Sequence, residues 1–155
     1  MAPMSTTSSP GLVSIGYEGR TLQDLLEVLA AEGVAVVADV RLTPLSRKPG
    51  LSKTKLAAAL AGAGIEYVHL RSLGNPKDNR APFWSGSPAV GVRRFRRMLA
   101  DPERSASIDE LAAIASERRV AVLCFERDHD RCHRQVVLDA TTERQGVSSA
   151  PVAYA

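Results

Sequence analysis

The residues with the most chemical potential lie in one short stretch, VLCFERDHDRCHR at positions 122–134, which holds both cysteines and two of the three histidines of the chain. Cys132 stands beside His133, close to the predicted start of a helix and among arginines. A helix N-terminus and nearby positive charge favour a thiolate over a thiol. The aspartates of the same stretch oppose that effect. This stretch is therefore predicted to carry a functional thiol at Cys132, shaped or activated by His133.

Cys124 ends an apolar run and is interpreted as a small buried side chain that contacts substrate. With two cysteines and no export signal, both thiols are expected to be reduced. Cys124, His129, Cys132 and His133 could supply four zinc ligands, but their spacing matches no common structural zinc pattern. We therefore predict no metal and no cofactor, and we keep a thiol-dependent or metal-dependent site in this stretch as an alternative.

Polar clusters of similar richness follow three other apolar runs: GYEGR, DVRLTPLSRKPG and HLRSLGN. Carboxylates beside apolar sequence suit general acid or base chemistry, and arginines suit phosphate or carboxylate binding through paired donors. Asp39 could equally orient Arg41. The candidates are Asp39, Glu126, Cys132 and His133 as catalytic residues, Arg41, Arg47 and Arg134 as anion ligands, and Tyr17, Glu18, His69 and Cys124 as substrate contacts.

Strands and helices alternate along the chain and must position these clusters. Short runs rich in β-branched residues at 12–16, 34–40, 65–70 and 120–125 predict four buried strands. Helical spacing of apolar residues predicts helices in the segments 21–33, 52–64, 89–100, 107–119 and 132–145, and 147–155 is a candidate edge strand. The expected fold is a three-layer α/β domain with a mostly parallel sheet of about five strands and helices on both faces.

Helix boundaries and one long connection are also predicted. Thr21 can cap the first helix and Gly33 can end it, and Ser107 and Glu110 stand in capping-box spacing. The segment 70–88 is rich in turn formers and has no helical period, which makes it a candidate lid or binding loop. In an open parallel sheet, ligands bind beyond the carboxyl ends of the strands. The polar clusters all occupy such positions, so we expect them to share one rim.

The composition is that of a single globular domain. The chain has 155 residues, of which 45% are hydrophobic and 24% charged, and a net charge of +3 gives a mild bias toward anionic partners. We predict a loose tail at 1–11, one domain at 12–155, no membrane span, and a cytoplasmic location because no secretory signal is evident. The arginines of VRRFRRML form a basic helix face, so a non-catalytic nucleic-acid-binding module is an alternative function.

The ordered motifs SIGYEGRTLQDLLEVL, ADVRLTPLSRKPGLSKTKLAAAL, GIEYVHLRSLGN and VLCFERDHDRCHR resemble the bacterial and archaeal domain-of-unknown-function family 488. The resemblance covers most of the chain from Val13 to about Asp139, and it implies an α/β fold without assigning a chemistry. LGNPKDN stands where such proteins often read LGG. A weaker likeness to rhodanese-like domains rests on Asp-Val-Arg and on the cysteine at a strand end, but the loop after Cys124 lacks the glycines of a phosphate or sulfur cradle.

Taken together, the polar clusters favour an enzyme, a hydrolase or transferase, acting on a phosphate-bearing substrate such as a nucleotide or a nucleic-acid component. Arg41, Arg47 and Arg134 would hold the anion, and Glu126 or Asp39 would move a proton. Substrate identity, reaction type and oligomeric state stay open.

Overall fold

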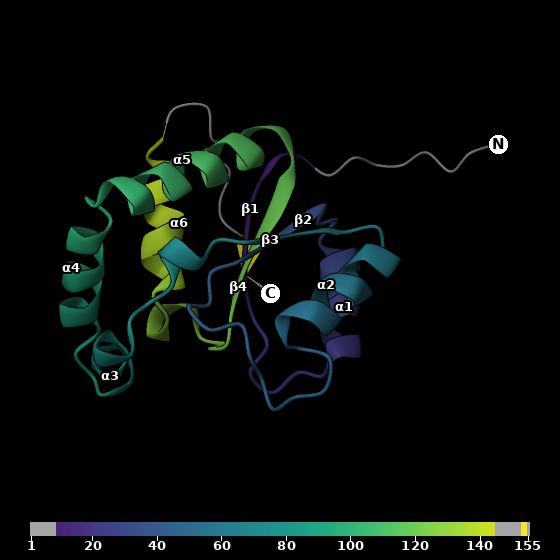
Figure 1. The fold of residues 1–155 in the computed structure, drawn as a ribbon, viewed down its shortest axis with the longest axis horizontal. Helices are drawn as coiled ribbons and strands as arrows, with labels where there is room; N and C mark the ends of the chain where they lie inside the picture. The colour runs from purple at the N-terminus through teal and green to yellow at the C-terminus, as the bar shows by residue number, and fades with distance from the viewer. Residues whose placement is uncertain (1–8, 145–152, 155) are drawn as a thin grey trace.

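The computed structural model describes residues 9–144 and 153–154, and these form a parallel sheet between two layers of helices (Figure 1). The strand order is β3-β2-β4-β1-β5, and every pairing is parallel. Four strands form the body of the sheet, and β5 adds two residues beside β1. The strands are β1 (Gly11–Gly16), β2 (Val36–Asp39), β3 (Glu66–His69), β4 (Arg119–Cys124) and β5 (Ala153–Tyr154).

The helices connect successive strands, as right-handed crossovers between parallel strands require. α1 and α2 lie on one side of the sheet, and α4, α5 and α6 lie on the other (Figure 1). The helices are α1 (Leu22–Ala31), α2 (Lys53–Gly62), α3 (Ala81–Trp84), α4 (Pro88–Met98), α5 (Pro102–Glu117) and α6 (Arg134–Thr142). The α/β class predicted from the sequence is thus confirmed.

Each face of the sheet has its own hydrophobic core because alternate strand residues point to opposite sides. Along β4, Val120 and Val122 pack toward α4, α5 and α6, together with Phe95 and Leu111. Ala121 and its alternating neighbours on the other strands pack toward α1 and α2. Within the described residues, no helix is long and apolar enough to cross a bilayer.

Local sequence signals place some boundaries well and others poorly. Thr21 caps α1 through a reciprocal capping box with Asp24, and Gly33 ends it with a positive φ, as predicted. α5 begins five positions before the predicted start at Ser107, because Asp101 is its N-cap and Pro102 fits the first turn. Ser107 therefore lies inside the helix, and the predicted capping box there is wrong.

Two further segments differ from the sequence prediction. β3 is not buried: it is the edge strand, and its residues are exposed or half-buried. The long connection 70–88 contains the 3₁₀ turns Arg71–Leu73 and Lys77–Asn79 and the short helix α3. These elements have too few residues to show a helical period in the sequence. Of the predicted tail, residues 1–8 lie outside the described residues, and Gly11 already belongs to β1. The predicted edge strand at 147–155 is described only at β5.

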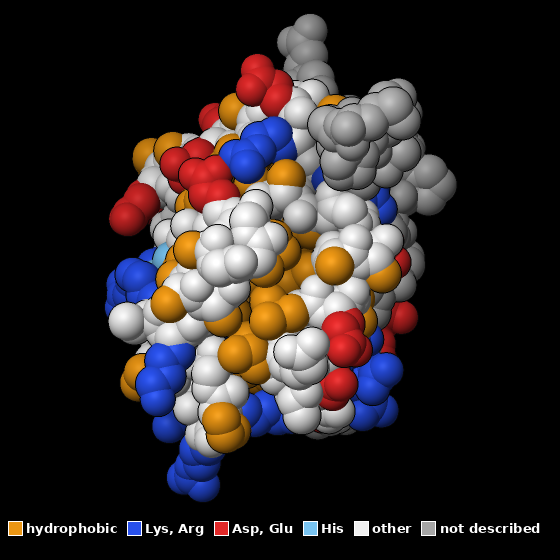
Figure 2. All heavy atoms as spheres, turned by 90° about the vertical axis from the view of Figure 1, so that its right-hand side faces the viewer, with side chains coloured by type: hydrophobic (Ala, Val, Ile, Leu, Met, Phe, Trp, Pro, Cys, Tyr) orange, Lys and Arg blue, Asp and Glu red, His pale blue; other side chains and the backbone are white. Residues whose placement is uncertain are grey.

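The strands end at the lower edge of the molecule as drawn in Figure 1. Figure 2 shows the α1 and α2 side of the molecule, with hydrophobic side chains in the middle of the face and Lys and Arg side chains prominent along the lower margin. The edge at which the strands end is therefore bordered by positive charge on this side.

Candidate functional site

A cavity of about 540 Å³ lies at the carboxyl ends of the strands. Its wall is built from the segments that follow β1, β2 and β4 and from the 70–88 connection, which contributes α3. Among the predicted site residues, it is lined by Tyr17, Arg41, Arg47, Cys124, Glu126, Cys132 and His133. Four distant segments of the chain therefore meet at one site, as the strand-end argument predicted.

Asp39 does not line this cavity but lies behind it, in a buried network with Arg41. Its carboxylate accepts hydrogen bonds from Arg41 Nε at 2.9 Å, Arg41 Nη2 at 2.7 Å and the Tyr67 hydroxyl at 2.6 Å. Burial lowers the pKa of Arg41, but the Asp39 carboxylate outweighs that effect and raises it above its usual value. With its oxygens so engaged, Asp39 is suited to holding Arg41 rather than to moving a proton.

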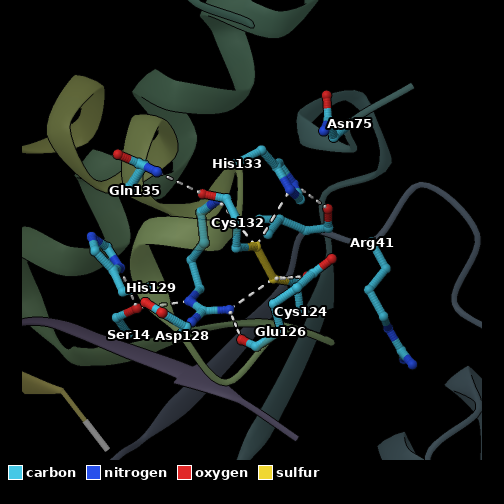
Figure 3. The surroundings of a disulfide bond; sticks show 12 residues. Ser14, Arg41, Asn75, Cys124, Glu126, Asp128, His129, Cys132, His133 and Gln135 are labelled. Carbon is cyan, nitrogen blue, oxygen red and sulfur yellow. Dashed lines mark hydrogen bonds between the residues drawn. A yellow bond between two sulfur atoms is a disulfide. The ribbon is translucent and has the colours of Figure 1, made fainter. Parts of the chain in front are cut away.

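Arg41 in turn anchors the loop that follows β2. Its Nη1 group donates to the Leu51 carbonyl at 2.7 Å and to the Tyr17 hydroxyl at 3.3 Å. Figure 3 shows the Arg41 side chain pointing away from the cysteine pair. Most of its donors are thus used inside the protein, so Arg41 shapes the cavity wall and contributes little free hydrogen-bonding capacity to a bound anion.

Cys124 and Cys132 are joined as a disulfide at the cavity wall (Figure 3). Both side chains are buried. This corrects the sequence-based expectation that both thiols are reduced, because the sequence did not indicate that Cys124, at the end of β4, and Cys132, two residues before the start of α6, meet. His133 lies against the pair, with Nδ1 3.6 Å from the Cys132 sulfur, while Nε2 donates to the Val40 carbonyl at 3.0 Å.

His133 is neutral near pH 7, since burial lowers its pKa to about 4. The Val40 carbonyl can only accept a hydrogen bond, so the ring proton is on Nε2 and Nδ1 presents a lone pair toward the sulfur. His133 is therefore a neutral lone-pair donor in this environment, not a cation.

Arg134 is buried beneath the cysteines and does not line the cavity. Its side chain donates from Nη1 to the Cys124 sulfur at 2.8 Å and to the Glu126 carbonyl at 2.8 Å, and from Nε to the Ser14 hydroxyl at 2.7 Å. Burial lowers its pKa to about 10. Its closest contacts indicate that Arg134 supports the Cys124 sulfur rather than a ligand in the cavity.

Glu126 provides the carboxylate of the cavity wall. Its Oε1 accepts a hydrogen bond from the Trp84 indole at 3.3 Å, and its Oε2 lies 3.5 Å from the Cys124 sulfur. The two other sequence candidates act outside the cavity. Glu18 accepts a hydrogen bond from the Arg127 backbone, and His69 donates from Nε2 to the Arg41 carbonyl. Both therefore position the loops of this rim.

Several cavity residues were not among the sequence candidates. They are Leu42, Thr43, Leu45, Ser46, Lys48, Asn75, Arg80, Phe83, Trp84, Phe125 and Arg131. The signals for them were the long 70–88 connection and the aromatic residues within and beside the clusters. Trp84 is 54% exposed and Phe125 is 43% exposed, which is unusual for large apolar side chains. Open aromatic surface in a cavity is suited to stacking against a planar ligand.

The fold and this site define an α/β domain whose candidate site is assembled at the carboxyl ends of a parallel sheet. The chain belongs to the family described as Domain of unknown function DUF488, which matches residues 21–141. No curated protein and no solved structure matches the chain. The weaker likeness to rhodanese-like domains consequently stays a prediction.

Proposed function

We propose that this protein is an enzyme that acts on a phosphate-bearing, nucleotide-like substrate in the cavity at the carboxyl ends of its strands. The observation that carries the proposal is the pairing of cationic side chains with open aromatic surface in one cavity. Its volume, about 540 Å³, lies within the range of small-molecule sites, roughly 300–1,000 Å³.

The cationic part of the cavity supports binding of a phosphate group. Arg47 is exposed and forms no ion pair with any described residue. Arg80 uses Nε to donate to the Asn75 carbonyl, which fixes its direction, and its terminal nitrogens form no hydrogen bond or ion pair with the described residues. Lys48 donates to the Arg20 carbonyl and adds a further positive charge. Paired arginine donors match phosphate oxygens in both charge and geometry.

The aromatic part of the cavity supports binding of a base or another planar group. Trp84 is held by its hydrogen bond to Glu126, and Phe125 follows Cys124 directly. Glu126 is the carboxylate among the described lining residues, so it is the group that we expect to transfer protons in this cavity. An anion site, a stacking surface and a candidate proton-transfer group are the components that a nucleotide-processing site needs.

The proposal is tested by titrating nucleotides and inorganic phosphate into the protein while recording the fluorescence of Trp84, the single tryptophan of the chain. Arg47→Gln and Arg80→Gln are expected to weaken binding by about 10-fold or more, because a hydrogen bond to a charged group is worth about 1.5–3 kcal/mol. Arg93→Gln on the exposed face of α4 is the matched control and should leave binding unchanged.

Turnover is tested separately with Glu126→Gln. Loss of a general acid or base lowers the rate by about 10²–10⁴-fold, so this variant should bind substrate but convert it slowly. The proposal fails if no member of a nucleotide panel or phosphate alters the Trp84 signal, or if Arg47→Gln and Arg80→Gln bind as tightly as the native protein. If Arg93→Gln alone weakens binding, the basic face of α4 is the interaction surface instead.

A further inference from the structure

The two cysteines and His133 form a cluster whose geometry fits a metal ion. The two sulfurs and a ring nitrogen of His133 lie within 4.8 Å of one another, and all three side chains are buried. The Cα atoms of Cys124 and Cys132 are 7.8 Å apart, whereas disulfides usually span about 4.4–6.8 Å. The backbone is therefore spaced more widely than a disulfide prefers, and this separation leaves room for a metal ion between two thiolates.

His133 is oriented as a metal-binding histidine is. A ligating imidazole usually donates its other N–H to a carbonyl or carboxylate, which fixes the ring and its tautomer. The Nε2 group of His133 donates to the Val40 carbonyl in this way, and Nδ1 faces the Cys132 sulfur (Figure 3). The lone pair that a metal requires is therefore already aimed at the cysteine pair.

The surroundings of the sulfurs support thiolates. Arg134, buried and without a carboxylate ion pair among the described residues, donates to the Cys124 sulfur, and its backbone N–H lies 3.4 Å from the Cys132 sulfur. A divalent cation, two thiolates, the Glu126 carboxylate and the Arg134 guanidinium together sum to zero charge. A buried cluster with balanced charge avoids the large cost of an unpaired ion in a low-dielectric interior.

We propose that, in the reduced protein, Cys124, Cys132 and His133 bind a zinc ion whose fourth coordination position opens into the cavity. A water molecule bound at that position would donate its proton to Glu126. Three protein ligands and an open position are the arrangement of catalytic zinc sites, which do not require the ligand spacing of structural ones. This explains how a spacing that argued against zinc in the sequence is compatible with a zinc site in the fold.

The inference rests on the proposed function for its substrate and narrows the reaction to hydrolysis. A thiol reductant or phosphine supplies the two electrons that cleave the disulfide, and zinc binding displaces the remaining thiol protons to solvent. Glu126 then accepts a proton from zinc-bound water. The resulting hydroxide forms a bond to the electrophilic centre of the substrate, and the bond to the leaving group breaks as Glu126 returns the proton to it.

The metal site is tested without any substrate. The reduced native protein, dialysed against zinc, is expected to retain about one zinc ion per chain by elemental analysis. Cobalt in the same site should give the visible absorption of a tetrahedral thiolate complex. Cys132→Ser and His133→Gln should lose zinc, whereas His129→Gln, a histidine of the same loop outside the cluster, and Glu126→Gln should keep it.

A second measurement avoids variants that fail to fold. Zinc should slow alkylation of both thiols in the reduced native protein, and a chelator should restore the fast rate. The zinc proposal is overturned if the reduced native protein retains no zinc, or if zinc leaves alkylation unchanged. Nucleotide binding by the metal-free protein is scored separately by Trp84 fluorescence, so failure of the metal site and failure of the proposed function give different results.

Discussion

Removing the Arg41 side chain should reveal how strongly the site depends on its buried ion pair. In Arg41→Met, the Asp39 carboxylate stays fully buried, and its remaining donors among the described residues are the Tyr67 hydroxyl and the backbone N–H of residue 41. Breaking one partner of a buried pair costs about 3–5 kcal/mol, because the remaining charge is left uncompensated. For a chain of this size, that corresponds to a fall in Tm of about 6–20 °C.

The matched control is Arg96→Met, which removes an arginine from another hydrogen-bonded ion pair with a carboxylate. Arg96 and Glu143 are 43% and 60% exposed, so solvent already screens their interaction. The control should change the free energy of unfolding by less than about 1 kcal/mol. Urea unfolding of both variants, with the slope of the transition unchanged, gives the comparison directly.

The double variant Asp39→Asn/Arg41→Met sharpens the test, because it removes both charges of the buried pair. Its destabilisation should be smaller than the sum of the two single variants, since neither charge is left alone. The reasoning is refuted if Arg41→Met costs no more than Arg96→Met, or if the single effects simply add. In the protein that still folds, the freed Leu51 carbonyl should loosen the loop carrying Arg47 and weaken phosphate binding.

Three further substitutions test how backbone packing and capping support the fold. Gly16→Ala would place a Cβ atom 1.9 Å from the Glu126 carbonyl oxygen. This variant should therefore destabilise the protein by about 2 kcal/mol or more and displace Glu126, the candidate proton-transfer residue. Its control is Gly62→Ala, which has open space around it and should be neutral or stabilising by up to about 1 kcal/mol. Asp101→Ala should cost about 0.5–2 kcal/mol in urea unfolding through loss of the α5 cap, and an unchanged midpoint would show that the cap is unimportant.

The sequence predicted the layers of the fold because each layer depends on periodicity along the chain. Alternating β-branched runs and helical spacing of leucines place residues on faces without any knowledge of distant contacts. The start of α5 was predicted wrongly because the sequence contains two capping signals, one at Asp101-Pro102 and one at Ser107. The helix begins at the first of them. The exposed β3 was missed because strand order within a sheet is set by tertiary packing, which a short apolar run does not encode.

The site was predicted at the level of segments but not of side-chain roles. Parallel topology alone brings strand ends to one edge, so the shared position of Tyr17, Glu126 and Cys132 followed from the order of elements. The direction of each side chain does not follow from topology. Asp39 and Arg134 are directed into the protein interior, where they form hydrogen bonds with other protein groups. Arg47 lines the cavity as predicted, whereas Arg80 comes from the 70–88 connection, which has no periodic signal.

The two buried arginines of the site differ in the groups that they contact. Arg41 has a carboxylate partner, which raises its pKa, whereas Arg134 has sulfur and neutral oxygens as partners, and burial lowers its pKa to about 10. A buried cation without a carboxylate is costly unless another anion lies beside it. The nearest group able to become that anion is the reduced Cys124 sulfur. This contact supports the proposal that the Cys124 sulfur of the reduced protein is a thiolate that binds a metal ion at the cavity wall.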